Sequence, residues 1–243
     1  MNGTGGPPPV PFVMLTDRVQ MIDGDYIRAD NEWDEIAWVW QQTVAPKGCK
    51  QEIIDGVVMV TPLPSVAHSS VAERVQRRLY EVISDDWGIY QRLALAVPSR
   101  LGLYVPDLVV VPEGELRAGD DNFVPAGKAQ LVVEITSKAT VGNDRIHKAA
   151  GYAETGIPLY LLIDFLAPGG PTSTLYGEPK GDTYRVLRAG RYGAPIALPR
   201  PFDVALESGD FPQPSSAATT TSTGTEITVD SRIESRANRS PTP

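Results

Sequence analysis

Residues 130–136 have the sequence QLVVEIT, an apolar run with a single carboxylate, Glu134, inside it. A second run, PDLVVV at residues 106–111, places Asp107 directly before four apolar residues. Continuous apolar runs of this kind are typical of strands that are covered on both faces of a sheet. The two runs therefore predict buried strands, each of which carries an acidic residue at or near one end.

The sequence before these runs predicts a helix, a hairpin, a second helix and a strand. Residues 30–44 carry apolar side chains at the three-and-four spacing of an amphipathic helix. In residues 51–61, two β-prone runs flank Asp55-Gly56, a strong hairpin signal. Ser65 can cap a helix that continues to about residue 84, and the alternation in residues 90–98 indicates another strand.

After the second run, the pattern favours one more helix and further strands. A helix is expected from about residue 143 to residue 155, and Gly156 is placed to end it. Its apolar side chains predict a buried stripe made of Ile146, Ala149, Ala150 and Ala153. Residues 157–165 predict a strand, and residues 184–197 predict a short strand or hairpin. This alternation of helices and strands predicts an α/β fold.

Composition divides the chain into three parts. Hydrophobic residues make up 42% of the sequence and charged residues 21%, which is close to the average of folded globular proteins. Residues 213–243 are rich in Ser, Thr and Pro with few apolar residues, and they predict a disordered tail. We expect residues 1–29 to form a flexible N-terminal segment and residues 30–212 to form the folded domain.

Charge, apolar runs and cysteine content limit the possible classes of protein. The net charge of −8 argues against a protein that coats nucleic acid non-specifically, because such binding depends on Lys and Arg. A metal-dependent nuclease tolerates this charge, since bound cations neutralise an acidic site. The start of the chain does not resemble a signal peptide, and no run is apolar enough to span a membrane. With Cys49 as the single cysteine, the sequence predicts a soluble, cytoplasmic protein.

The buried carboxylates require an explanation. An ionised Glu134 inside an apolar strand must be paired, hydrogen-bonded or bound to a metal, and an ordinary ion pair is one alternative. Asp107 alone is equally compatible with a turn residue at a strand entrance. Together the two carboxylates can bind Mg²⁺, which commonly takes one or two carboxylates plus waters and phosphate oxygens. Lys148 lies in a polar row with Asp144 and Tyr152, spaced i, i+4, i+8, which is also compatible with an exposed Asp–Lys pair.

These features occur in an order that resembles a known family. The residues that carry the resemblance are Glu52-Ile53-Ile54-Asp55-Gly56, Pro64, His68, Pro106-Asp107, Val133-Glu134-Ile135-Thr136-Ser137, Asp144, Lys148, Tyr152, Gly156-Ile157-Pro158, Tyr160 and Ile163-Asp164. The set is similar to the Uma2 family, which is grouped with the PD-(D/E)XK restriction-endonuclease-like nucleases. The resemblance covers residues 30–190.

The resemblance implies a restriction-endonuclease-like core, in which a central mixed sheet is flanked by helices. It implies Asp107 and Glu134 as ligands of Mg²⁺ or Mn²⁺, together with the backbone carbonyl of Ile135. Thr136 occupies the position where the general nuclease pattern has Lys, and Lys148 resembles a relocated equivalent. Lys138 is the second choice. Glu52, His68 and Asp144 are auxiliary, whereas His147 is expected at the surface.

The functional prediction is a metal-dependent endonuclease that hydrolyses DNA phosphodiester bonds, and a homodimer is the assembly that would suit cleavage of both strands. Arg74, Arg77 and Arg78 can contact phosphates or simply form a solvated helix face. One rival is a protein with a nuclease fold that binds nucleic acid or protein without cleaving. A second rival is a metal-free α/β protein in which Glu134 and Lys148 form a structural ion pair.

Overall fold

The computed structural model describes residues 31–116 and 122–212 of the chain, so the segment 1–29 and the tail 213–243 lie outside the described residues. The helices are α1 (Glu32–Gln42), α2 (Val66–Tyr80) and α3 (Ala149–Glu154). A π-helical turn, Asn143–Lys148, leads directly into α3. Short 3₁₀ turns comprise Pro98–Arg100, Glu113–Leu116, Ala126–Lys128 and Ser208–Asp210.

The strands form two sheets and one separate pair. A five-stranded sheet has the order β2-β1-β5-β4-β7, with bounds Val57–Thr61, Lys50–Ile54, Gly102–Tyr104, Ala94–Val97 and Phe123–Pro125. A six-stranded sheet has the order β11-β10-β9-β8-β6-β3, with bounds Thr183–Arg191, Thr172–Lys180, Leu159–Asp164, Leu131–Ile135, Leu108–Pro112 and Trp87–Tyr90. β12 (Ile196–Leu198) pairs with β13 (Val204–Leu206). Both sheets are mixed, because β8–β9 and β4–β7 are parallel pairs.

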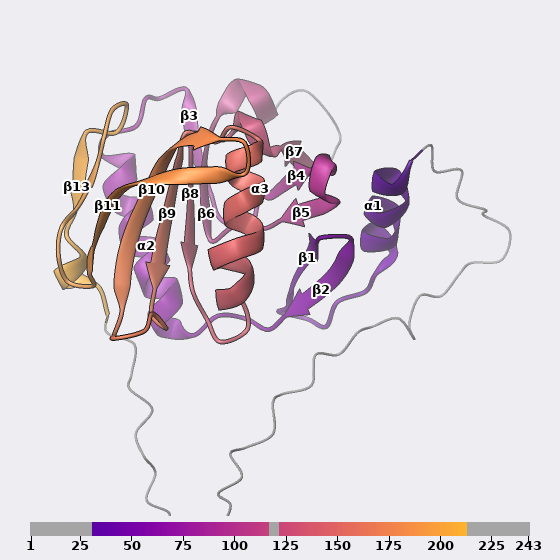
Figure 1. Cartoon of the computed structure of the whole chain (residues 1–243), viewed down its shortest axis with the longest axis horizontal. Coiled ribbons are helices and arrows are strands. Elements are labelled where there is room, and N and C mark those ends of the chain that lie inside the picture. Colours follow the sequence, from indigo (N-terminus) through magenta and orange to yellow (C-terminus); the bar gives the residue numbers. More distant parts are fainter. Residues whose placement is uncertain (1–30, 117–121, 213–243) are drawn as a thin grey trace, which may run out of the picture.

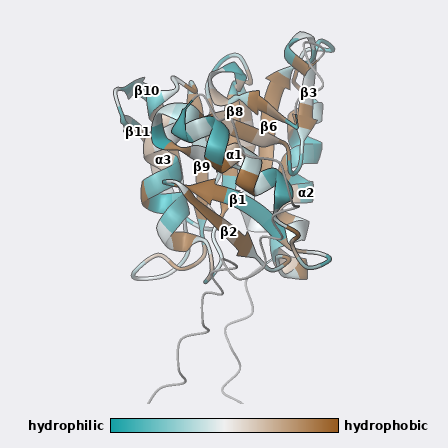
Figure 2. Cartoon of the chain, turned by 90° about the vertical axis from the view of Figure 1, so that its right-hand side faces the viewer, coloured by the Kyte–Doolittle hydropathy of each residue, from teal (hydrophilic) through white to brown (hydrophobic). Residues whose placement is uncertain are grey.

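The six-stranded sheet is the central layer of the molecule (Figure 1). Leu108 and Val110 project to one face, where α2 and the β12–β13 pair complete a hydrophobic cluster. Val109 and Val111 project to the opposite face, toward α3 and the five-stranded sheet. This two-sided burial explains why the strands are continuously apolar, and it confirms the predicted α/β fold with a mixed sheet between helices. Figure 2 shows the apolar character of this layer as hydrophobic colour along β6.

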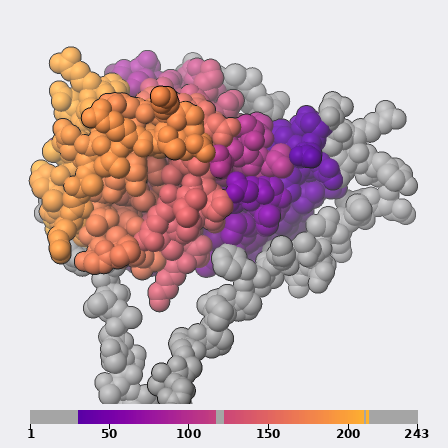
Figure 3. Space-filling view, in the orientation of Figure 1, coloured from indigo at the N-terminus to yellow at the C-terminus, as the bar shows by residue number. Residues whose placement is uncertain are grey.

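The two ends of the molecule are built from opposite ends of the chain. Figure 3 shows α1 and the β1–β2 hairpin at one end and the strands β10 to β13 at the other. The hairpin turns at Asp55 and Gly56, which have positive φ values of 47° and 76°. Ser65 caps α2 by accepting a hydrogen bond from the backbone N–H of His68 at 3.3 Å. The predicted hairpin turn and helix cap are therefore confirmed.

The predicted strand over residues 90–98 is confirmed for residues 94–97, but its start is wrong, because the segment contributes to two sheets. β3 ends at Tyr90 and pairs with β6, whereas β4 begins at Ala94 and pairs with β5. Arg92, with φ of 63°, lies in the connection between them. In β4, Leu95 and Val97 face one hydrophobic cluster while Ala94 and Ala96 face another. The alternation of large and small residues thus reflects two unequal buried faces.

The predicted buried stripe of the helix around residues 143–155 is confirmed only in part: Ala153 is buried and Ala149 packs against a hydrophobic cluster, but Ile146 does not belong to the inner face. The side chain of Ile146 faces outward, and the residue is 65% exposed. Three polar residues of the same segment have no exposed surface: Asp144, Lys148 and Tyr152. The polar row therefore forms the inner face of the π-helical turn and α3. A polar row can face inward only when its charges find partners, and the strands opposite supply them.

Candidate active site

Two neighbouring strands bring Asp107 and Glu134 to the same edge of the central sheet. β6 and β8 are antiparallel with Leu108 opposite Val133, so the next position along the register places Asp107 opposite Glu134. The backbone N–H of Ile135 donates to Asp107 Oδ2 at 2.8 Å. The three predicted metal ligands, Asp107, Glu134 and Ile135, therefore lie together.

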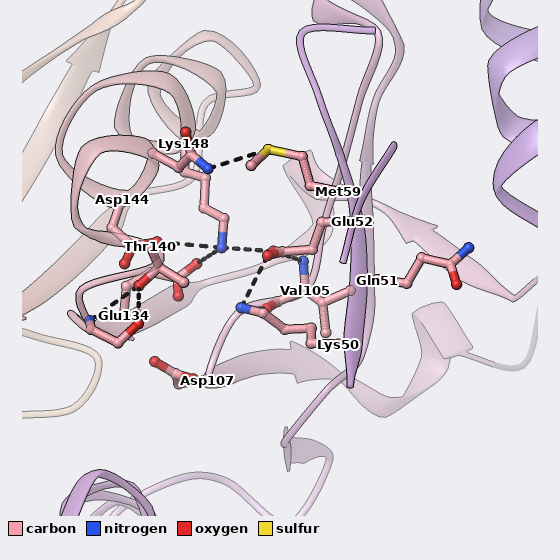
Figure 4. Close-up of polar contacts among 12 residues, drawn as sticks. Lys50, Gln51, Glu52, Met59, Val105, Asp107, Glu134, Thr140, Asp144 and Lys148 are labelled. Carbon is pink, nitrogen blue, oxygen red and sulfur yellow. Dashed lines mark hydrogen bonds and ion pairs between the residues drawn. The ribbon is translucent and has the colours of Figure 1, made fainter. Parts of the chain in front are cut away.

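Lys148 reaches this pair from the π-helical turn (Figure 4). Its Nζ lies 2.9 Å from Glu134 Oε1, 2.7 Å from Glu52 Oε1 and 3.4 Å from Asp144 Oδ1. The Tyr152 hydroxyl also donates to Glu134 Oε1, at 2.7 Å. Within the described residues, both hydrogen bonds to the Glu134 carboxylate go to Oε1, so Oε2 is the oxygen that a cation could take.

Glu52 joins the site from β1, in the five-stranded sheet. Its Oε1 accepts a hydrogen bond from the backbone N–H of Val105 at 2.7 Å, and its Oε2 lies 3.1 Å from Lys50 Nζ. Burial acts to raise the pKa of Glu52, but the neighbouring Lys148 and Lys50 ammonium groups outweigh it and lower that pKa below its usual value. Glu52 is therefore an ionised partner of both lysines.

Lys50 is the residue at this site that the sequence analysis missed. It stands two positions before Glu52 on β1, so the two side chains project from the same face of the strand. Its Nζ also donates to the carbonyl of Val105 at 3.0 Å. The period of two along the predicted hairpin strand was the signal that could have found it.

His68 contacts Asp107 from the first turns of α2. Its Nε2 lies 2.9 Å from Asp107 Oδ1, and its side chain is largely buried. Burial acts to raise the pKa of Asp107, but the His68 contact, the charge of Lys50 and the N–H of Ile135 together lower it. Asp107 is therefore ionised at neutral pH.

The pKa of Glu134 is shifted in the opposite direction. Burial raises the pKa of Glu134 to about 8, because the favourable charge of Lys148 is offset by the nearby carboxylates of Asp144 and Asp107. Burial likewise raises the pKa of Asp144, although Lys148 opposes the shift. Asp144 Oδ1 and Oδ2 are also buried with no hydrogen-bond partner of good geometry among the described residues.

The charges of the site fit a divalent cation. The two ionised carboxylates, Glu52 and Asp107, balance the two lysines, whereas the other two acids have raised pKa values. A divalent cation carries the two positive charges that would allow Glu134 and Asp144 to ionise as well. In residues 31–116 and 122–212, no group of three or more His, Cys, Asp or Glu side chains is arranged to hold a metal. A cation here would rely on two carboxylates, a backbone carbonyl and water, a donor set that suits Mg²⁺.

A cleft of about 860 Å³ opens onto one side of this cluster. Among the residues that line it are Lys50, His68, Asp107, Ile135 and Lys138, and the side chain of Asp107 is 16% exposed. Lys148 and Glu134 lie behind the cleft wall, with 0% and 1% of their side-chain surface exposed. The site therefore has an accessible layer and a buried layer.

Thr136, at the position where the general nuclease pattern has Lys, has a different role. Its hydroxyl donates to Asp164 Oδ1 at 3.0 Å and accepts from the backbone N–H of Phe165 at 3.0 Å. Arg145 Nε completes the group by donating to Asp164 Oδ2 at 2.7 Å. Thr136 thus ties the end of β8 to the end of β9, and the lysine beside Glu134 comes from the π-helical turn instead.

The remaining candidates lie away from the cleft. His147 is at the surface, as predicted, with 42% of its side chain exposed and Nδ1 beside Asp55 Oδ2. Arg74, Arg77 and Arg78 line a separate cavity of about 440 Å³ on α2. Arg77 and Arg78 are paired with Glu73 and Glu81, respectively.

Comparison with known proteins identifies the family. Residues 39–210 match the family model of Uma2, described as "Putative restriction endonuclease". The chain belongs to the Uma2 family. Among solved structures, this Uma2 chain is similar to a protein described as a "putative nuclease belonging to DUF820" from Anabaena variabilis, with a TM-score of 0.51 and 17% sequence identity. The match covers 70% of this chain and 93% of that one, and it shows a shared fold.

Two further findings concern this Uma2 chain. No curated protein sequence matches it. None of the helices in the described part of the chain is long and apolar enough to cross a membrane. The functional conclusion therefore depends on the family and on the geometry of the site.

Proposed function

We propose that this Uma2 protein is a Mg²⁺- or Mn²⁺-dependent endonuclease that hydrolyses DNA phosphodiester bonds. The observation that carries the proposal is the position of Asp107, which lines an accessible cleft and lies opposite Glu134 in the register of β6 and β8. Membership of a family described as restriction endonucleases supports a nuclease, and DNA is the substrate that this description favours.

Asp107, Glu134 and the carbonyl of Ile135 would hold the cation. When bound, it would supply Lewis-acid polarisation of the phosphate and a lower pKa for an attacking water. The chain's own residues prepare this site. His68 and the N–H of Ile135 fix the two oxygens of Asp107, whereas Lys148 and Tyr152 fix Oε1 of Glu134.

The reaction adds one water across a phosphodiester bond. A bond forms between the water oxygen and phosphorus, one P–O ester bond breaks, and the leaving oxygen takes up a proton. The cleft gives the substrate and this water access to Asp107, while Lys148 acts through Glu134 because its own surface is fully enclosed. We therefore assign Lys148 as a positioning residue that favours the ionised form of Glu134.

Cleavage assays test this function directly. Purified protein is incubated with plasmid, single-stranded DNA and RNA, each with Mg²⁺, with Mn²⁺ and with EDTA. We expect nicked or linear plasmid only when a divalent cation is present, and no product from a Glu134→Gln protein. A wild-type protein that leaves all three nucleic acids intact with both cations would contradict the proposal.

One observation favours a second candidate, a nuclease-fold protein that binds a partner without cleaving nucleic acid. Lys148 contacts three carboxylates, so these acids have a cationic partner within the protein itself. This candidate predicts no Mn²⁺ binding in a calorimetric titration, whereas the endonuclease predicts binding that Asp107→Asn weakens.

A homodimer, which would bring two clefts to the two strands of a duplex, is a further part of our proposal, as is a cytoplasmic location.

A further inference from the structure

The site contains two lysines in different environments. Lys148 has no exposed side-chain surface, and its three donors face Glu52, Glu134 and Asp144. Lys50 lies on the other side of Glu52, its side chain is 16% exposed, and it lines the cleft beside Asp107. Figure 4 shows the two ammonium groups approaching Glu52 from different directions. Of these two lysines, Lys50 is the one that a molecule in the cleft can touch.

We infer that Lys50 is the lysine that contacts the substrate phosphate, whereas Lys148 acts only on the carboxylates behind the cleft wall. The inference rests on the proposed function and assigns a substrate contact within the same site. Lys50 is suited to this contact because Nζ is held by Glu52 Oε2 at 3.1 Å and by the carbonyl of Val105 at 3.0 Å. These two interactions use two of its three ammonium protons, and the third is available to an anion.

Electrostatics support the same assignment. The charge of Lys50 lowers the pKa of Asp107, Glu134 and Asp144 as well as that of Glu52, which its ammonium group contacts directly. A phosphate that entered the cleft beside Asp107 would meet a site rich in carboxylates. Lys50 supplies positive charge at the accessible side, where repulsion of the phosphate would otherwise be strongest.

Replacement of Lys50 leaves Glu52 with partners, although the carbonyl of Val105 loses one hydrogen bond. Glu52 would keep its contact with Lys148 and its hydrogen bond from the N–H of Val105. We therefore expect Lys50→Met to fold with a melting temperature near that of the wild type. Lys47→Met is a matched control, because Lys47 is exposed, precedes the same strand and does not line the cleft.

The experiment measures binding and cleavage separately. Binding of a fluorescent DNA oligonucleotide is followed by anisotropy in Ca²⁺ at several salt concentrations, and cleavage of the same DNA is followed in Mg²⁺. A lysine that contacts a phosphate adds about one unit to the slope of log K against log salt. We expect Lys50→Met to lose this unit and to lower kcat by about 10²-fold, the effect of removing one transition-state donor. Lys50→Arg should retain most of the rate, and Lys47→Met should equal the wild type.

Each outcome decides the question. An unchanged salt slope in Lys50→Met, or wild-type kcat in that variant, would overturn the assignment of Lys50 even if the protein is a nuclease. A protein that binds DNA with the expected slope change but never cleaves would support the Lys50 contact and refute the proposed endonuclease. A wild-type protein that does not bind DNA would refute both. If Lys50→Met unfolds, Lys50→Gln takes its place, because its side-chain amide can still donate to the carbonyl of Val105. A wild-type salt slope in Lys50→Gln would overturn the assignment, and a slope lower by about one unit would support it.

Discussion

Asp107 and Glu134 lie opposite each other on paired strands, yet their surroundings shift their pKa values in opposite directions. Asp107 borders the cleft, where His68 and the N–H of Ile135 stabilise its charge. Glu134 is enclosed behind the cleft. Burial and two neighbouring acids raise its pKa by more than the charge of Lys148 lowers it. Two carboxylates at opposite positions of one strand pair therefore have pKa values shifted in opposite directions, so at neutral pH Asp107 is ionised whereas Glu134 is largely protonated.

The largest expected effect comes from removal of either carboxylate. Asp107→Asn and Glu134→Gln each remove a negative ligand, so cleavage should fall by about 10³-fold or more and Mn²⁺ binding should weaken. Plasmid nicking rates and calorimetric titration measure the two effects. Glu178→Gln is the control. Glu178 lies on β10, two strands away from β8, and its side chain is 61% exposed. Wild-type cleavage by either site variant would remove that residue from the site.

The next largest effect concerns the buried layer alone. Lys148→Met would leave the ionised Glu52 with Lys50 as its remaining cationic partner and would leave Glu134 and Asp144 without one. Loss of one member of a buried ionic group typically destabilises a protein by about 3–5 kcal/mol. Chemical denaturation measures this loss, and added Mn²⁺ should restore part of it because ligand binding stabilises the folded state.

A surface ion pair provides the contrast for that measurement. Lys128 and Glu115 form a pair at 3.0 Å with 49% and 38% of their side chains exposed. Lys128→Met should therefore lower the free energy of unfolding by about 1 kcal/mol or less. If Lys148→Met costs no more than Lys128→Met, the buried network does not hold the site together.

The sequence allowed prediction of those features that depend on local chemistry. The Asp55-Gly56 turn, the Ser65 cap and the buried strands around Asp107 and Glu134 all follow from residue type and spacing. The acidic pair could be predicted because a carboxylate in an apolar strand requires a partner. The polar row with Lys148 could be found for the same reason.

Features that depend on tertiary partners could not be predicted in this way. Ile146 was expected to be buried, but the inner face of its helix carries Lys148, because Glu52 and Glu134 meet that face from two different sheets. β10, Thr172–Lys180, was missed because its polar and small residues carry little β-strand signal, although the strand pairs with both β9 and β11. Lys50 was missed because its position depends on Glu52 and on the carbonyl of Val105, which directly follows β5.

A smaller effect should appear in the pH dependence of stability without metal. Because the pKa of Glu134 rises from 4.5 to about 8 on folding, the folded state binds an extra proton between these values. The contribution of Glu134 to stability is thus fully present below pH 4.5 and is lost as pH rises toward 8. Asp107 has a lowered pKa, so its contribution is lost only as pH falls below its usual range.

Thermal unfolding in EDTA from pH 5 to pH 8.5 tests this contrast. The melting temperature of Glu134→Gln relative to the wild type should increase steadily up to about pH 8 and then level off. Asp107→Asn should show no such trend in the same window. A constant difference between Glu134→Gln and the wild type would mean that Glu134 is ionised in the metal-free protein, and that Lys148 alone is sufficient to charge it.

The smallest effect is expected from Arg77, which lies on α2 but does not line the cleft. Arg77 is paired with Glu73 and lines a cavity separate from the cleft, so Arg77→Ala should leave cleavage and the salt dependence of DNA binding unchanged. Lys138→Ala is the matched comparison, because Lys138 lines the cleft and should reduce the salt slope if it contacts a phosphate. Anisotropy titrations at several salt concentrations distinguish the two. A slope lowered by about one unit in Arg77→Ala would show that the bound DNA extends along α2. The substrate path would then continue beyond the cleft, and the charge of this helix face would belong to the binding surface.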